Sequence, residues 1–191
     1  MTPEVPVFFA TTEGQTQLIA ERMAAVLRET GIDSRTIDLG GGAATVDWPR
    51  VRGAIVGASL HTGRHQAAVT VFVAANTALL NARPTLFFSV SLSAASENPK
   101  ERTAAREIAE AFPRTVGWTP RTIANIAGRL AYTKYGFLKR WMMKRIARKE
   151  GAPTDTSRDY ELTDWTEVER LAREFAMTME REKAGHGRPA R

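Results

Sequence analysis

Short apolar runs, each followed by a polar loop and then by a stretch of helical periodicity, constrain the fold of this chain most. The runs are Val5 to Ala10, Arg52 to Ser59 and Thr85 to Leu92, and the loops after them are rich in Thr, Ser and Gly. Strands that are apolar at nearly every position are buried on both faces. Their alternation with helices predicts a parallel sheet that is covered by helices on both sides.

Periodicity places the remaining elements around these three strands. Apolar residues recur at helical spacing from Leu18 to Leu27, and Gly31 follows as a stop signal. Asp164 and Glu167 form a capping-box-like start for the last helix, which we expect to run to about residue 181. The other predicted elements are an edge strand at 34–39, helices at about 66–80 and 100–112, and a weaker strand at 122–127.

Length and composition narrow the class of protein. With 191 residues the chain is long enough for one buried core, and no apolar run approaches the roughly 20 residues of a membrane-spanning helix. The first residues lack the basic start of an export signal, so we expect the protein inside the cell. There is no cysteine, and 3 histidines are too few and too scattered to indicate a metal site. We predict one domain at 1–182, with an insertion at about 129–157 and a disordered tail at 183–191.

The positive charge of the chain is concentrated in one segment. The formal charge of +6 comes from 27 Lys and Arg against 21 Asp and Glu. Between Lys134 and Glu150, seven basic residues stand against one acidic residue, so the rest of the chain is neutral. A nucleic-acid binder usually spreads basic residues over a face of its fold. We therefore expect no nucleic-acid partner.

This basic segment, residues 134–150, also has an apolar stripe. Leu138, Trp141, Met142 and Ile146 recur at helical spacing. The pattern suits a helix on an anionic membrane surface, with the stripe in the interface and the cations on lipid phosphates. The alternative is a helix whose stripe packs on its own domain and whose cations are solvated. The local concentration of charge favours the membrane.

The three polar loops are expected to meet at one edge of the sheet, because parallel sheets bind ligands outside the carboxyl ends of their strands. The first loop combines hydroxyls, a glycine and a helix N-terminus, which suit a phosphate. It lacks the Gly-Lys-Ser/Thr ending of a triphosphate loop and the Gly-x-Gly-x-x-Gly of a dinucleotide loop, so a monophosphate held by neutral donors is predicted. The alternative is that the hydroxyls only cap the helix. The candidate residues are Thr11, Thr12, Glu13, Gly14, Gln15 and Thr16.

The other two loops are predicted to hold a planar ring between them by backbone hydrogen bonds. His61 and His65 suggest acid–base chemistry, but an exposed, non-catalytic histidine is the favoured interpretation for an isolated loop residue. No Ser/His/Asp set or paired-carboxylate motif emerges elsewhere, and no catalytic side chain is predicted. The candidate ring-binding residues are Ser59, Leu60, His61, Thr62 and Gly63 in one loop and Ser89, Val90, Ser91 and Leu92 in the other.

At these loops the chain resembles the flavodoxin superfamily, whose first loop carries a Thr/Ser-x-Thr-Gly-x-Thr-like phosphate signature. More specifically, it resembles the flavodoxin-type menaquinone-dependent protoporphyrinogen IX dehydrogenases. Two departures stand within the pattern: Ala10 replaces a frequent serine, and Thr62 and Arg64 replace frequent aromatic residues. The resemblance is carried by Glu13-Gly14-Gln15-Thr16, Gly57-Ala58-Ser59, Ser89-Val90, Lys100-Glu101-Arg102-Thr103, Ile126-Ala127-Gly128, Thr154-Asp155-Thr156 and Thr163-Asp164-Trp165.

The resemblance implies a flavodoxin-like three-layer α/β/α sandwich with five parallel strands in the order 2-1-3-4-5 and a basic helical insertion that interrupts or follows the last strand. It implies FMN, with its phosphate on residues 11–16 and its isoalloxazine between residues 59–65 and 89–93. The flavin would carry the redox chemistry itself.

The resemblance also implies a substrate and an acceptor. The substrate would be protoporphyrinogen IX, oxidised to protoporphyrin IX in haem biosynthesis, and electrons would pass to a membrane quinone, menaquinone or ubiquinone. This places the protein in the cytoplasm, peripherally on the inner face of the cell membrane. Cations suit both lipid phosphates and porphyrinogen propionates. The residues expected to contact membrane or substrate are Arg129, Lys134, Lys139, Arg140, Trp141, Lys144 and Arg145.

Other functions stay open at this point. An electron-transfer flavodoxin would hand electrons to protein partners, but such carriers are usually acidic, whereas this chain is basic. Another FMN-dependent quinone reductase is a further alternative. A non-enzymatic interaction module with a degenerate flavin site is the last, and the departures at Ala10 and Thr62 keep it open. The sequence also leaves open whether the chain forms homo-oligomers.

Overall fold

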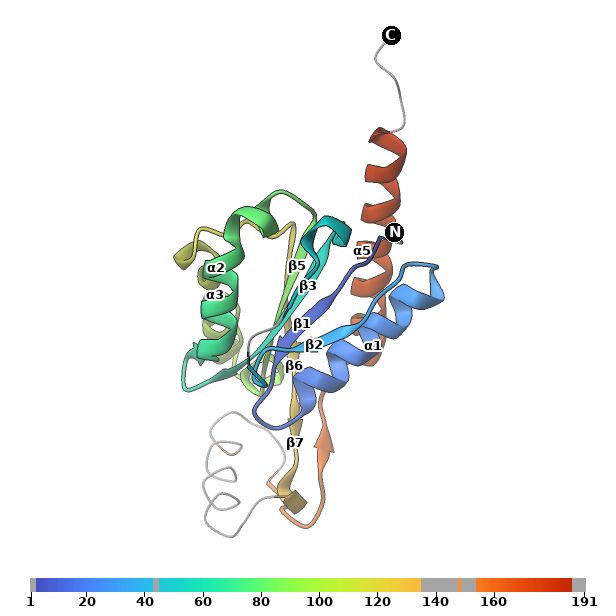
Figure 1. The fold of residues 1–191 in the computed structure, drawn as a ribbon. Coiled ribbons are helices and arrows are strands. Elements are labelled where there is room, and N and C mark those ends of the chain that lie inside the picture. Colours follow the sequence, from blue (N-terminus) through green and yellow to red (C-terminus); the bar gives the residue numbers. More distant parts are fainter. Residues whose placement is uncertain (1–2, 43–44, 135–147, 149–153, 187–191) are drawn as a thin grey trace.

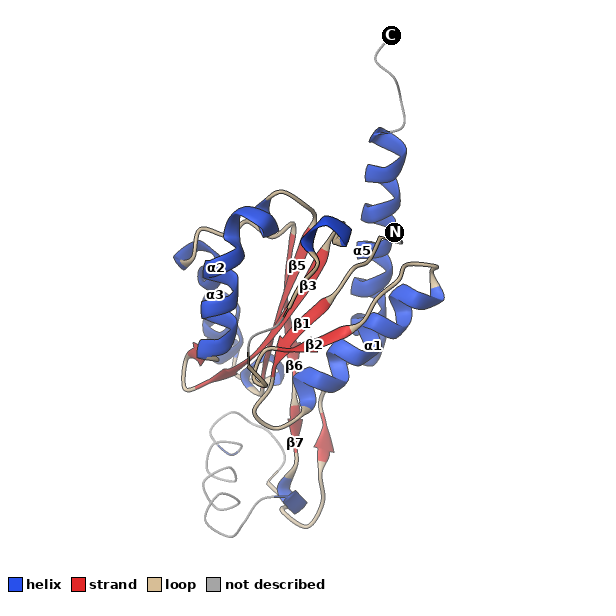
Figure 2. Cartoon of the chain, in the orientation of Figure 1, coloured by secondary structure: helices blue, strands red, loops and turns tan. Residues whose placement is uncertain are grey.

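The structure is a computed structural model that describes residues 3–42, 45–134, 148 and 154–186 (Figure 1). The strands and helices of the predicted sheet and its covering layers follow one another in the expected order, and three short strands that were not predicted accompany them, at 64–65, 129–130 and 160–161 (Figure 2). The strands are β1 (Val7–Ala10), β2 (Thr36–Asp38), β3 (Ala54–His61), β4 (Arg64–His65), β5 (Thr85–Ser91), β6 (Thr122–Ala127), β7 (Arg129–Leu130) and β8 (Tyr160–Glu161). The helices are α1 (Gln15–Glu29), α2 (Ala67–Asn81), α3 (Pro99–Thr115) and α5 (Trp165–His186), with 3-10 turns η1 (Trp48–Arg50), η2 (Ser93–Ala95) and η3 (Tyr132–Lys134).

Five parallel strands form the central sheet in the order β2-β1-β3-β5-β6. Counted among themselves, these strands have the predicted order 2-1-3-4-5, which is therefore confirmed. The chain runs from β1 outward to β2 and then returns past β1 to β3, so that Ala10 lies beside Ala58 in the register. In open parallel sheets, ligands bind at such a switch point, outside the carboxyl ends of the strands.

Alternating side chains create a separate core on each face of the sheet. Val7 and Phe9 of β1 belong to the core beneath α1 and α5, whereas Phe8 and Ala10 belong to the core beneath α2 and α3. Figure 1 shows the same division, with α1 and α5 on one side of the sheet and α2 and α3 on the other. The predicted three-layer sandwich is thus confirmed. None of the described helices combines the length and hydropathy needed to cross a membrane.

Local signals end and begin the helices where the sequence indicates. Gly31 follows α1 with φ 83°, and its N–H donates to Arg28 O at 3.0 Å. Asp164 Oδ1 accepts from Glu167 N–H at 3.1 Å and caps α5. That helix continues to His186, beyond the expected end near residue 181, so the helix includes the first residues of the predicted tail. Residues 187–191 lie outside the described part of the chain.

The insertion leaves the sheet after β6 without interrupting that strand. β7 and β8 pair as a two-stranded antiparallel stalk, with Arg129 opposite Glu161. Because β7 follows directly after β6, the stalk projects from the carboxyl end of the parallel strands (Figure 1). The predicted basic helix falls largely on residues 135–147 and 149–153, which lie outside the described residues.

Candidate functional site

The first loop lies between β1 and α1, at the point where the strand order reverses. Gly14 has φ 89°, a left-handed conformation that favours glycine, and its N–H donates to Thr11 Oγ1 at 2.9 Å. No acidic residue stands in the first turn of α1. The loop therefore presents a helix N-terminus whose partial positive charge suits a phosphate.

Two buried polar atoms at the start of α1 have no hydrogen-bond partner among the residues that the structure describes. They are Gln15 Oε1 and Thr16 Oγ1, and Thr16 is only 1% exposed. Native proteins rarely leave a buried hydroxyl unpaired, because the free-energy cost of removing it from water is then not offset by a hydrogen bond. A phosphate oxygen would accept from this hydroxyl, so the residues of the first loop fit the phosphate of FMN.

The second loop is a β-hairpin, not the polar loop expected from the sequence. β3 continues to His61, which pairs with Arg64 of β4. Thr62 and Gly63 form the two-residue turn, with φ of 47° and 77°, as the hairpin type with two left-handed residues requires. Pairing with β4 extends β3 beyond its apolar run. The apolar pattern of β3 alone does not reveal that pairing. A left-handed threonine costs on the order of 1 kcal/mol and is the kind of strain found at functional sites.

Gln66, which the sequence pattern did not single out, connects the first two loops. Its Nε2 donates to Thr12 Oγ1 at 3.2 Å and also contacts Ser59 Oγ. Thr12 Oγ1 and Ser59 Oγ are themselves 3.5 Å apart. The predicted meeting of these loops at one edge of the sheet is therefore confirmed. The sequence offered only one indication that Gln66 lies at the site, namely its position directly before α2, after the second loop.

The third set of candidate residues lies at the end of β5, where the strand predicted at 85–92 places it. Ser89, Val90 and Ser91 belong to β5 and are buried, and Ser59 lies beside Val90 in the strand register. Leu92 emerges from the strand and packs against the apolar residues at the base of the stalk. The buried serines and Val90 thus lie at the carboxyl end of β5, next to β3. The other residues expected to flank a ring lie in the β3–β4 hairpin.

The two histidines of the hairpin have different surroundings. His61 is exposed, as expected, whereas His65 is half-buried against Phe87 and Phe112, with ring centroids 5.4 and 4.9 Å away. The expectation of exposure is wrong for His65 because its pairing on β3 turns it toward the core. His65 Nε2 lies 3.0 Å from Ser89 Oγ. Burial lowers the pKa of His65 from 6.5 to about 4, so the ring is neutral at pH 7.

The lowered pKa of His65 predicts a loss of stability in mild acid. Between pH 6.5 and about 4 the unfolded chain binds a proton at this residue that the folded protein does not, so the free energy of unfolding falls as pH falls through that window. Allowing for partial exposure, we expect a contribution of about 1–2 kcal/mol. Urea unfolding of wild type and His65→Gln at several pH values measures it. His61→Gln is the matched control and should keep the wild-type slope; an unchanged slope in His65→Gln would contradict the prediction.

The residues predicted to contact membrane or substrate are placed only in part. Arg129 lies half-buried in β7, and Lys134 ends η3. The structure sets both in the stalk region, on the carboxyl side of the sheet. The rest, Lys139, Arg140, Trp141, Lys144 and Arg145, lie outside the described residues.

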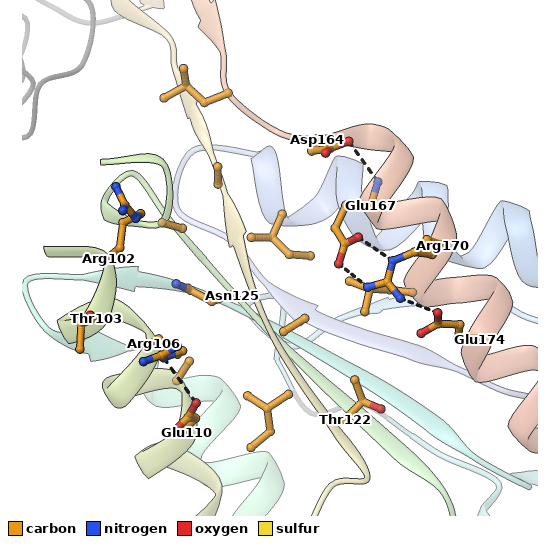
Figure 3. A pocket seen from close by; sticks show the side chains of 18 of the residues that line it. Arg102, Thr103, Arg106, Glu110, Thr122, Asn125, Asp164, Glu167, Arg170 and Glu174 are labelled. Atoms are coloured by element: carbon orange, nitrogen blue, oxygen red, sulfur yellow. Dashed lines mark hydrogen bonds and ion pairs between the residues drawn. The ribbon is translucent and has the colours of Figure 1, made fainter. Parts of the chain in front are cut away.

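A separate groove of about 800 Å³ follows the outer edge of β6, between α3 and α5 (Figure 3). Its arginines already have partners: Arg170 and Arg106 pair with glutamates of their own helices, and Arg102 Nη1 donates to Ser96 O at 2.5 Å. Arg170 contacts Glu167 at 2.6 Å and Glu174 at 2.5 Å, and Arg106 lies 3.8 Å from Glu110. Because these cations are already engaged, the groove suits an anion less well than the first loop does.

Comparison with known proteins agrees with this geometry. A family model described as flavodoxin domain matches residues 6–157. Protoporphyrinogen IX dehydrogenase (quinone) of Escherichia coli strain K12 is 34% identical over 171 residues, which are 89% of this chain and 93% of that protein. The protein of the same name from Leishmania major is 30% identical over 178 residues, 92% of this chain and 75% of that protein.

Solved structures support the fold alone. Flavodoxin 1 from Bacillus cereus has a TM-score of 0.55 at 16% identity, covering 91% of this chain and 97% of that one. A flavodoxin from the domain Archaea has a TM-score of 0.55 at 15% identity, covering 93% and 99%. Strand order, first loop and near-full-length similarity thus agree, and the chain belongs to the flavodoxin-domain family of quinone-dependent protoporphyrinogen IX dehydrogenases.

Proposed function

We propose that this protein binds FMN and oxidises protoporphyrinogen IX to protoporphyrin IX, with a membrane quinone as electron acceptor. The supporting observation is the 34% identity with the Escherichia coli relative that is named for this reaction, over 93% of that protein. A fold alone does not imply a function, so the residues of the site must also agree. They do so at the first loop, where the buried Thr16 hydroxyl and the start of α1 suit a phosphate.

When bound, the flavin supplies the redox chemistry of such an enzyme. The residues of this chain bind and orient it. Thr16 and the N-terminus of α1 would hold the phosphate, while the β3–β4 hairpin and the end of β5 would flank the ring. Gln66 adds to the residues expected from the sequence, because its contacts with Thr12 and Ser59 hold the first loop against the hairpin.

The basic segment 134–150 would bring this site to the quinone. Its support is its sequence, which joins seven cations to an apolar stripe at helical spacing. A cationic amphipathic helix binds anionic lipid surfaces through both features. The quinone is dissolved in that membrane, so we assign the segment to the acceptor half of the reaction rather than to the porphyrinogen half.

Anaerobic half-reactions test both statements. Protein loaded with FMN should lose its flavin absorbance on addition of protoporphyrinogen and regain it on addition of vesicles that contain anionic lipid and a menaquinone analogue. The variant with Lys139, Arg140, Lys144 and Arg145 changed to Gln should keep the first half-reaction and slow the second, and high salt should slow it in wild type. The control variant changes four exposed cations elsewhere, Arg52, Lys100, Arg114 and Arg181, to Gln.

The possible outcomes separate the alternatives. If FMN binds but porphyrinogen never reduces it, the dehydrogenase assignment fails and an electron carrier is favoured. If FMN does not bind, an interaction module is favoured instead. If the quadruple variant loses the porphyrinogen half-reaction and keeps the quinone half, the segment serves the substrate and its assignment to the membrane fails.

A further inference from the structure

A set of hydrogen bonds, of which the one between Gln15 and Thr163 is buried, fastens the stalk to the first loop. Gln15 Nε2 donates to Thr163 Oγ1 at 2.9 Å and to the two carboxylate oxygens of Glu161 at 3.0 and 3.2 Å. Thr163 Oγ1 in turn donates to Ala127 O at 2.7 Å, and Thr163 N–H donates to Glu161 Oε1 at 3.0 Å. Gln15 and Thr163 are each 7% exposed. These bonds join the start of α1, the end of β6 and the end of β8 in one place.

These hydrogen bonds connect residues that are far apart in the sequence, so they form only when the stalk lies in this position against the first loop. Glu161 lies 146 residues from Gln15, and Thr163 lies 148 residues from it. A buried amide donor is costly to leave unpaired, so Gln15 favours only placements of the stalk that bring these acceptors to it. Gln15 also directly precedes Thr16, whose buried hydroxyl we assign to the phosphate. The attachment therefore reaches into the loop that would hold the cofactor.

A second contact joins the stalk to the third loop. Leu92, directly after β5, packs against the small apolar cluster of Leu130, Ala131 and Tyr132. Tyr132 is fully buried there, and its ring lies edge-on to that of Tyr160 at 6.3 Å. The stalk thus contacts two of the loops that flank the expected flavin site. It is hydrogen-bonded to the first loop and packs through apolar side chains against the third loop.

We propose that Glu161 and Thr163 are positioning residues that couple FMN binding to the attachment of the stalk. Neither belongs to the residues expected to touch the cofactor; both act through Gln15. The proposal rests on the proposed function only in taking FMN as the ligand of the first loop. Coupling of this kind is reciprocal. FMN must therefore lower the equilibrium constant for opening of the stalk by the same factor by which a loosened stalk weakens FMN binding.

Hydrogen exchange of the full chain, with and without FMN, tests this coupling. In wild type, FMN should slow amide exchange in peptides that cover residues 129–133 and 159–163 by about fivefold or more. In Glu161→Ala that slowing should disappear, and the dissociation constant for FMN should rise by a similar factor. Glu161→Gln retains an acceptor oxygen and should restore most of both effects. Thr163→Val removes the second acceptor at nearly constant volume and should have the same effects as Glu161→Ala. It therefore tests the coupling also in the case that Glu161→Ala folds poorly.

A matched control lies farther along the same stalk. Asp159 accepts from Thr133 N–H at 2.9 Å and from Thr133 Oγ1 at 2.8 Å. Asp159→Ala should speed exchange of the stalk in both states but keep the slowing by FMN, because it leaves the bonds to Gln15 in place. If wild type binds FMN and its stalk exchanges as before, this inference fails while the proposed function stands. If FMN does not bind at all, both fail.

Discussion

Replacing Thr16 with valine is expected to weaken FMN binding by about 10- to 100-fold and to leave the protein at least as stable as wild type. The hydroxyl is buried and has no partner within the described residues. A hydrogen bond from a hydroxyl to a charged phosphate contributes about 1.5–3 kcal/mol, which valine, of nearly the same shape, removes. In the protein without cofactor the same change removes an unpaired polar group, so the free energy of unfolding should stay the same or rise by up to about 1 kcal/mol.

Two measurements separate these opposite effects: the dissociation constant from quenching of FMN fluorescence, and urea unfolding without FMN. Thr85→Val is the control, because Thr85 is also buried but its Oγ1 accepts from Trp118 Nε1 at 3.0 Å. That variant should lose stability and keep its affinity for FMN. Wild-type affinity in Thr16→Val would show that this hydroxyl does not meet the phosphate.

Trp118→Ala is expected to lower the free energy of unfolding by about 3–5 kcal/mol. Trp118 is 1% exposed and lies edge-on to Phe87, with ring centroids 5.6 Å apart. Its removal leaves a large cavity in the core under α2 and α3 and deprives Thr85 of its donor. Trp118→Phe should cost less, because it keeps an aromatic ring in the cavity and loses only part of the volume and the hydrogen bond.

Urea unfolding followed by far-ultraviolet circular dichroism measures this loss without relying on the removed indole. Trp48→Ala is the matched control, since Trp48 is only partly buried at the rim of the same core. It should cost clearly less than Trp118→Ala. Equal losses in the two variants, or a loss below about 1 kcal/mol in Trp118→Ala, would contradict the importance assigned to Trp118.

Much of the fold follows from short-range patterns in the chain. The run Val5 to Ala10 becomes β1, and the helical spacing from Leu18 to Leu27 becomes α1, because the apolar periodicity that predicts each element recurs within a few residues. The cap of Asp164 on α5 is equally local. The strand order came from resemblance rather than from periodicity, because no single element records which strands lie beside it.

The candidate site also has features that the sequence shows and features that only the structure shows. The hydroxyls and glycine of the first loop are visible as a contiguous motif, and its position at the sheet edge follows from the parallel strands. Gln66 was missed because its role depends on Thr12 and Ser59, residues of other elements. His65 was misjudged because a hairpin partner turns its ring toward Phe87.

By itself, then, the sequence determined the alternation of strands and helices, the concentration of charge at 134–150 and the first loop with its hydroxyls and glycine. All three are encoded by residues close together in the chain. The tertiary structure alone decided that Thr16 is buried with no partner among the described residues, that the pKa of His65 is lowered to about 4, and that Gln15 is bonded to Glu161. Each of these depends on which distant segments exclude water from a group or supply its hydrogen bond, and the chain specifies that only once the sheet has assembled.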